Sequence, residues 1–300
     1  MEAGDSDLGI SVRSGLVIEV HGATVLLMWA TGGFFFLWVT TRWREVGLGY
    51  GWVMRITYIG IAALGVVTGI VSGPYWPREI AGLAMIAGAA GALVVSVVRR
   101  RAGVAGQRGV TERRTARVAE MTGIDREEQR FDPTAAEFPP RLDLAAPALG
   151  LIAIVVGALH AEGPAWLSVA RVLAGAAFLG VVSDAMLLGH WYLVQPGLPR
   201  ARLLELVRLT GVAWVPHVVV FLLPTGMWSV LNGSIDDGYG GMLGWFWLAS
   251  TVTTIVLVFV TRAALKERQY AAVMAATGLM YLAILTAFGQ DVVARILLDR

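Results

Sequence analysis

Long uninterrupted apolar runs separated by short polar stretches dominate the pattern of this chain. Eight such runs occur, at residues 15–40, 51–73, 79–98, 144–162, 166–195, 203–227, 241–262 and 269–289. Each is close to the length that an α-helix needs to cross about 30 Å of hydrocarbon. The runs lack the alternation of apolar and polar residues that is typical of β-barrel strands. The pattern therefore predicts an all-α, polytopic integral membrane helix bundle of about eight transmembrane helices.

One long polar segment, residues 99–143, separates the first three runs from the last five. It begins with three consecutive arginines and ends in Phe138-Pro139-Pro140. The chain is accordingly divided into a three-helix membrane segment (1–98), a charged cytoplasmic linker (99–143) and a five-helix membrane segment (144–300). Such a segment is typical of a solvated connection, and a docking surface for a cytoplasmic partner or an anionic lipid is the functional alternative.

Basic residues are distributed unequally between the two sides of the predicted bundle. The segments 41–50, 99–143, 196–203 and 262–268 hold 17 of the 24 Lys and Arg residues, whereas the segments on the other side hold four. The positive-inside rule places the arginine-rich side in the cytoplasm and both termini on the outer side. The first ten residues carry no basic residue, which disfavours a secretory signal. We expect a multi-pass protein of a bacterial inner (plasma) membrane.

The composition agrees with this architecture and narrows the chemistry. Hydrophobic residues make up 56% of the 300 residues and charged residues 15%, against about 25% charged in a typical soluble chain. The absence of Cys excludes disulfides, Cys-ligated zinc, iron–sulfur clusters and c-type haem. The single lysine, Lys266, lies in a charged loop, which disfavours a retinal Schiff base. No nucleotide-binding or hydrolase motif occurs, and no nucleic-acid partner is expected.

Histidines inside the predicted spans are the first candidates for chemistry, because polar groups are costly in the membrane. His21 in the first helix and His217 in the sixth lie about 9 Å and about 14 Å below the outer surface at 1.5 Å per residue. Two neutral imidazoles on separate helices are what a six-coordinate b-type haem needs. His21 and His217 are therefore candidate ligands of a haem iron. The alternative is that each histidine makes an interhelical hydrogen bond.

Residues near the two histidines fit the same hypothesis. Gly22, Gly32 and Gly33 would leave space on the first helix for a flat ring. Arg171, near the outer end of the fifth helix, is a candidate partner for the haem propionates. His160, at the outer end of the fourth helix, is a further candidate for cofactor binding, although water can satisfy a side chain at that boundary.

A second polar group is predicted at the inner face, around the hairpin at residues 195–200. Counted from the middle of the hairpin, His190 lies nine residues back and Arg208 nine residues forward, so both should lie at a similar depth. Asp184 lies further from the end of its span and has no obvious partner in the sequence. Asp184, His190 and Arg208 are therefore candidate catalytic residues of a pocket for a quinone headgroup or for proton transfer. The alternative is a structural ion-pair network that includes Glu205 and Arg208.

These observations predict an inner-membrane redox subunit that binds haem b, with a quinone as a further candidate ligand, and passes electrons to or from a partner complex. If the chain is an enzyme, it is an electron-transfer oxidoreductase subunit. The expected partners are membrane lipid and other membrane or peripheral redox subunits. Two alternatives remain open: a cofactor-free accessory or anchor subunit of a larger membrane complex, and a small-solute or ion permease whose polar path uses Asp184, Arg171 and His190.

Overall fold

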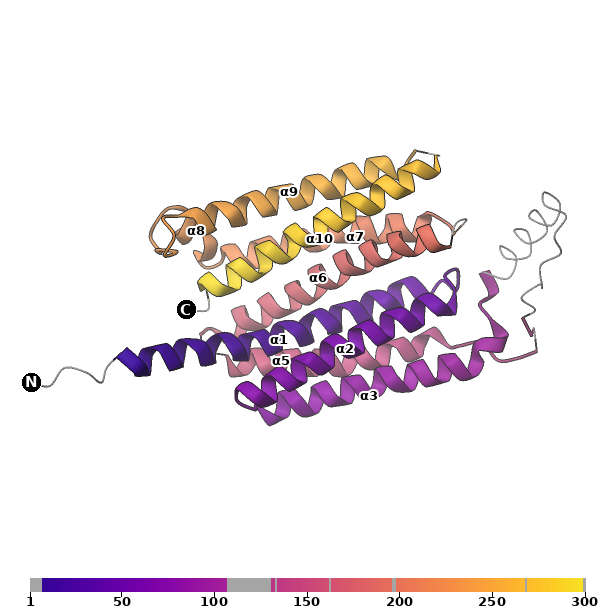
Figure 1. The fold of residues 1–300 in the computed structure, drawn as a ribbon, viewed down its shortest axis with the longest axis horizontal. Coiled ribbons are helices and arrows are strands. Elements are labelled where there is room, and N and C mark those ends of the chain that lie inside the picture. The colour runs from indigo at the N-terminus through magenta and orange to yellow at the C-terminus, as the bar shows by residue number, and fades with distance from the viewer. Residues whose placement is uncertain are drawn as a thin grey trace, which may run out of the picture.

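The computed structural model describes residues 7–106, 131–132, 134–161, 163–195, 198–267 and 269–298, with the backbone alone for 7–21 and 270. Long helices account for most of these residues and no strand occurs among them (Figure 1). The helices are α1 (Asp7–Thr41), α2 (Leu48–Ser72), α3 (Trp76–Val98), α5 (Ala145–His160), α6 (Ala165–Val194), α7 (Ala201–Leu222), α8 (Gly226–Leu231), α9 (Met242–Ala264) and α10 (Tyr270–Leu298), with short 3₁₀ turns η1 (Arg99–Ala102) and η2 (Pro140–Leu144).

Eight spans in the described part of the chain are long and apolar enough to cross a membrane, as the apolar runs predict. The largest difference in boundaries concerns the last one. The apolar run ends at residue 289, but α10 continues to Leu298. It can do so because Asp291 and Arg295, four residues apart, form an ion pair on one face of the helix. A paired acid and base cost less to bury than either charge alone.

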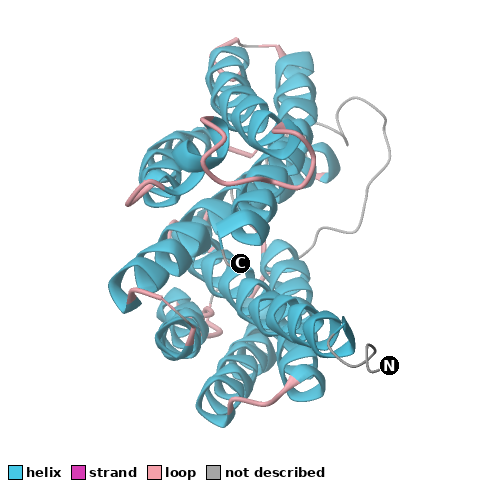
Figure 2. Ribbon diagram, turned by 90° about the vertical axis from the view of Figure 1, so that its left-hand side faces the viewer, coloured by secondary structure: helices cyan, strands magenta, loops and turns pink. Residues whose placement is uncertain are grey.

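The spanning helices form two groups of four. In the first group α1 packs against α2 and α5, and α3 closes the ring by contacting both of those helices. In the second group α6 packs against α7 and α10, and α9 closes the ring. The two groups occupy the lower and upper halves of Figure 1, and Figure 2 shows them nearly end-on. The polar segment 99–143 thus separates three helices from five along the chain, whereas in space α5 joins the first three.

The two four-helix groups meet where α1 crosses α6 at a pair of glycines. A Cβ added at Gly32 would lie 1.8 Å from the carbonyl oxygen of Ala176, and one added at Gly180 would lie 2.3 Å from the carbonyl carbon of Gly32. The two backbones are therefore in direct contact. Small residues at helix crossings allow this approach in membrane proteins, where dispersion contacts between helices replace the hydrophobic driving force of water.

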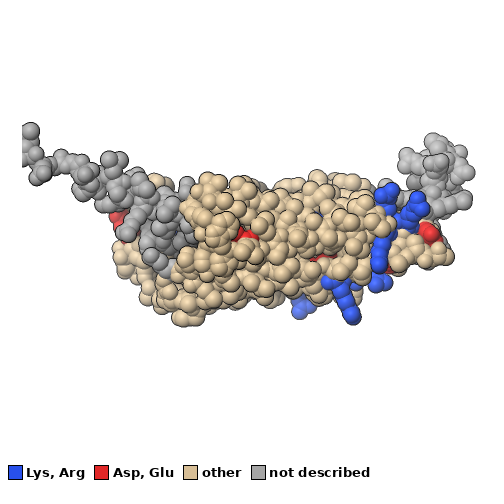
Figure 3. Space-filling model, turned by 90° about the horizontal axis from the view of Figure 1, so that it is seen from below, with Lys and Arg blue, Asp and Glu red and all other residues tan. Residues whose placement is uncertain are grey.

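Charged side chains are concentrated at one end of the molecule. Figure 3 shows the Lys and Arg side chains of one face gathered toward this end. The turns at 42–47, 99–103, 200–202 and 262–267 carry basic residues. We call this the arginine-rich end. The other end holds the turns at 73–75 and 223–241 and the end of α10.

At that other end Asp237 caps α9. Its Oδ2 accepts hydrogen bonds from the backbone N–H groups of Leu243 at 2.8 Å and Gly244 at 3.4 Å, and its Oδ1 accepts from Tyr239 and Gly241. Desolvation raises the pKa of Asp237. The hydrogen bonds from these backbone N–H groups together lower it by a larger amount, so the pKa lies below its ordinary value. The carboxylate therefore stays charged and satisfies donors that the first turn of a helix leaves unpaired.

The glycine crossing yields a direct prediction for stability. Gly180→Ala should lower the free energy of unfolding by about 1–3 kcal/mol, because the added Cβ meets backbone atoms that cannot rotate away. Thermal unfolding of the purified protein in detergent measures the change. Gly278→Ala on α10 is the matched control, since nothing lies within 4 Å of the position of its Cβ. Equal unfolding temperatures for the two variants would contradict the proposed importance of the crossing.

Candidate functional site

A completely buried carboxyl group belongs to Asp184 on α6. The hydroxyl of Tyr58, on α2, donates a hydrogen bond to its Oδ1 at 2.5 Å. Its Oδ2 has no hydrogen-bond partner, and no Arg or Lys of the described part of the chain forms an ion pair with it. The ring of Tyr58 fills the space beside Gly33 of α1. Three helices therefore enclose this carboxyl: α1 and α2 of the first four-helix group and α6 of the second.

Asp184 and Tyr58 lie at matching depths. Tyr58 is ten residues from the start of α2 and Asp184 ten residues from the end of α6, which is about 15 Å from the arginine-rich end of each helix. Between them and that end lies Tyr50, a buried tyrosine whose hydroxyl also lacks a partner in the described structure. Asp184 is four residues from Gly180, so the carboxyl lies on the α6 face that crosses α1.

His190 and Arg208 occupy other surroundings. The His190 side chain is exposed, with its Nδ1 3.4 Å from the hydroxyl of Tyr281. Arg208 is exposed on α7. No hydrogen bond or ion pair joins Asp184, His190 and Arg208 to one another. Six residues of α-helix separate Asp184 from His190, which places the two side chains about 120° apart around α6. Matching depth therefore does not bring them onto one face.

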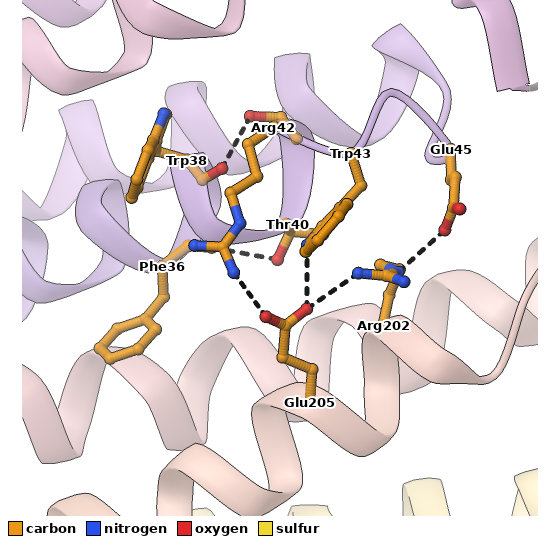
Figure 4. Close-up of polar contacts among 9 residues, drawn as sticks. Phe36, Trp38, Thr40, Arg42, Trp43, Glu45, Arg202 and Glu205 are labelled. Atoms are coloured by element: carbon orange, nitrogen blue, oxygen red, sulfur yellow. Dashed lines mark hydrogen bonds and ion pairs between the residues drawn. The ribbon is translucent and has the colours of Figure 1, made fainter.

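Glu205, predicted to lie near this group, belongs to a separate network at the arginine-rich end (Figure 4). Its Oε1 accepts a hydrogen bond from Arg42 at 2.5 Å, and its Oε2 accepts from Trp43 at 3.0 Å and Arg202 at 3.1 Å. Arg202 also pairs with Glu45 at 2.8 Å and lies over the Trp43 ring. This network fastens the turn between α1 and α2 to the start of α7. The network is partly exposed, so water solvates its charges, and its role is structural.

His217 belongs to a buried cluster of charged side chains inside the second group. Its Nε2 lies 3.0 Å from Oδ1 of Asp291, and Arg295 binds the same carboxylate through Nε at 2.8 Å and Nη2 at 3.1 Å. The rings of Phe178 and Phe221 lie 4.4 and 5.1 Å from the imidazole, centroid to centroid. His217 is 1% exposed. Sequence reasoning offered an interhelical hydrogen bond as the alternative role for this histidine, and the structure contains one.

The surroundings of His217 do not fit a haem placed between it and the first helix. Helix α6 packs against both α1 and α7 and so lies between them, with Phe178 against the imidazole. The space beside Gly32 is filled by the α6 backbone, and that beside Gly33 by a tyrosine ring. His21 lies in α1, but its side chain is outside the described residues. The haem ligand pair therefore stays a prediction, without support from the packing of the described residues.

The two remaining candidates lie near the end of the molecule opposite the arginine-rich end. Arg171 donates hydrogen bonds to the carbonyl oxygens of Val220 and Leu223, each at 3.3 Å. It thus satisfies carbonyl groups where α7 ends. His160 is exposed and its ring stacks on Tyr75, with centroids 3.9 Å apart. Neither contact tests a role in cofactor binding.

Several functional candidates escape sequence reasoning. The Asp291–Arg295 pair has a detectable signal, the spacing of four residues between opposite charges at the end of an apolar run. Tyr58 has none, because a tyrosine inside a span is ordinary and its partner lies 126 residues away. The pairing of Arg55 with Asp143 is equally invisible, since it joins α2 to a residue of the predicted linker.

Comparison with protein-family models, curated proteins and solved structures finds no match to this chain. Within the described residues, no three His, Asp or Glu side chains gather as ligands for a metal ion. Evidence on function therefore comes from the geometry of the buried polar groups.

The cluster around Asp291 should be essential for folding. Asp291→Asn removes the charge of a buried carboxylate that both Arg295 and His217 contact, which should lower the free energy of unfolding by about 3–5 kcal/mol. Glu205→Gln is the matched control, because its ion pairs are partly exposed and should contribute about 0–1 kcal/mol. Thermal or denaturant unfolding in detergent compares the two. A smaller loss for Asp291→Asn than for Glu205→Gln would contradict the assignment.

Proposed function

We propose that this chain is a membrane permease that conducts protons, with Asp184 as the group that binds the transported proton. The observation that carries the proposal is the isolation of this carboxyl. It is completely buried among apolar spans, and among the described residues its Oδ2 has no partner and Tyr58 supplies its single hydrogen bond. An uncompensated carboxylate is costly to bury, so the site favours a bound cation, of which a proton is the smallest.

The position of Asp184 suits a transported proton. The carboxyl lies one helical turn from the glycine crossing, on the surface where the two four-helix groups meet. Small movements of one group against the other would expose such a carboxyl to one side of the membrane and then to the other, which is how many permeases give alternating access. Tyr58 lies beside the carboxyl, and Tyr50 lies between it and the arginine-rich end. The hydroxyl group of each tyrosine can donate and accept a hydrogen bond.

Proton entry into sealed vesicles tests this proposal. Purified protein is reconstituted with an internal pH-sensitive dye, and a potassium diffusion potential, negative inside, drives protons inward. Wild-type vesicles should acidify several-fold faster than protein-free vesicles, and Asp184→Asn should return the rate to that of protein-free vesicles. Thr210→Val, which alters a buried hydroxyl on α7 that bonds only its own helix, should keep the wild-type rate. Equal rates for wild-type protein and protein-free vesicles would refute the proposal.

The redox subunit with a b-type haem is the second candidate. One observation favours it. Among the described residues, His217 contacts a carboxylate through Nε2, and its buried Nδ1 has no partner. A histidine that binds a metal through one ring nitrogen commonly bonds a carboxylate through the other. The packing around α6 favours the permease, so we expect no Soret band in protein purified after expression with adequate haem. A Soret band that His217→Ala removes would establish the redox function instead.

We also propose that the arginine-rich end faces the cytoplasm of a bacterial cell and that both termini face outward. The support is the uneven distribution of Lys and Arg, with 17 of the 24 on one predicted side. The chain has no Cys, so single cysteines report their side without background. In intact cells an impermeant thiol reagent should label Tyr239→Cys and leave Glu267→Cys unlabelled. The reverse pattern would invert the orientation.

A further inference from the structure

A cleft opens at the arginine-rich end, between the turn that joins α1 to α2 and the segments that flank the polar connection. Its walls include Gly47, Leu48 and Gly51 at the start of α2, Arg44 in the preceding turn, and Glu137 and Phe138 from the chain just before η2. Arg55 lines the same cleft from below. None of these residues takes part in the proposed proton path.

Arg55 has donors for which the described part of the chain offers no acceptor. Its Nε and Nη2 donate to the two oxygens of Asp143, at 2.8 and 2.9 Å, and its guanidinium lies 4.6 Å from the centre of the Phe138 ring. The residue is 1% exposed, yet Nη1 has no hydrogen-bond partner. Nη1 carries two N–H groups. Leaving buried, charged donors unpaired is costly, so an oxygen from outside the chain is expected to complete the site.

Gly51 shows where Nη1 points. A Cβ at this position would lie 2.8 Å from Nη1, so the absence of a side chain at Gly51 makes room for the guanidinium. Gly51 itself lines the cleft. The unpaired nitrogen therefore lies beside a residue that lines the cleft.

The start of α2 adds further donors at the same place. Gly47 precedes the helix, no side chain caps its first turn, and no acidic residue occurs there. The unpaired N–H groups of a helix N-terminus attract anions, and α2 is 25 residues long. Arg44 stands at the rim, half exposed, in a long ion pair of 3.5 Å with Glu137. Glu137 is the one acidic residue among the described residues that line the cleft, and an incoming anion would compete with it for Arg44.

Asp143 is paired with Arg55, and the pair as a whole presents no net charge to an anion in the cleft. Both of its oxygens already accept hydrogen bonds, from Arg55 and from the hydroxyl of Thr41. We propose that the cleft binds a phosphate group, held by Nη1 of Arg55, by the first backbone N–H groups of α2 and by Arg44. A phosphate oxygen presents the acceptors that these donors lack. The group has two sources at a membrane surface, inorganic phosphate and the headgroup of an anionic lipid.

Gly51→Ala tests the proposal while keeping both residues of the Arg55–Asp143 pair. Delipidated protein is unfolded thermally in detergent with inorganic phosphate, and in parallel with chloride at equal ionic strength. Phosphate should raise the unfolding temperature of the wild type in a saturable manner, and Gly51→Ala should weaken its affinity roughly tenfold or more. Gly60→Ala is the matched control on the same helix, because nothing lies within 4 Å of its Cβ position. Arg44→Gln, at the exposed rim, provides a second variant and should weaken binding as well.

A parallel series in mixed micelles separates the two sources. Stabilisation by inorganic phosphate identifies a free anion, whereas stabilisation by phosphatidylglycerol, but not by phosphatidylcholine or inorganic phosphate, identifies a lipid headgroup. Either result must be lost in Gly51→Ala and kept in Gly60→Ala. The proposal is overturned if neither probe stabilises the wild type, or if Gly51→Ala responds as the wild type does. These readouts measure binding alone, so they are independent of proton conduction.

Discussion

The direct contact between the backbones of α1 and α6 is the constraint on which the rest of the structure depends. Gly32 and Gly180 lie so close that neither position has room for a Cβ. This crossing sets the separation of the two four-helix groups, and it also fixes what lies beside it. Tyr58 fills the space next to Gly33 and reaches Asp184, while Phe178 on another face of α6 covers His217. One close approach thus determines the surroundings of both buried sites.

Charge compensation explains why Asp184 stands apart. Three other buried carboxylates in the described spans each have an arginine partner: Glu79 pairs with Arg78, Asp143 with Arg55, and Asp291 with Arg295. Burial of a charge is tolerated when an opposite charge and hydrogen bonds accompany it. Asp184 has a tyrosine hydroxyl instead. Such a carboxyl is neutral when it carries a proton, and without the proton its negative charge has no opposite charge beside it. Proton binding is therefore strongly coupled to the environment of the carboxyl.

Depth along a helix was predictable for the candidate residues, whereas the direction of each side chain was not. Asp184 is buried well inside its span, as its sequence position indicates. His190 is also near its expected level, but the rotation of α6 turns it to the surface. His217 faces α10, which contributes Asp291 from 74 residues away. In a chain with nearly uniform apolar runs, hydropathy gives little information about rotation, because lipid and the protein interior are similarly apolar.

The sequence by itself determined that the described part of the chain is helical without strands, that eight spans are long and apolar enough to cross a membrane, and that arginines gather at one end. Each of these follows from hydrophobic length or from charge counts, which are local properties. Only the tertiary structure decided that the spans form two groups of four, that α6 lies between α1 and α7, and that Tyr58, Asp291 and Gly51 matter to the sites. Those facts depend on which helices touch and on which face, and contacts between residues more than a hundred positions apart leave no mark on a single sequence.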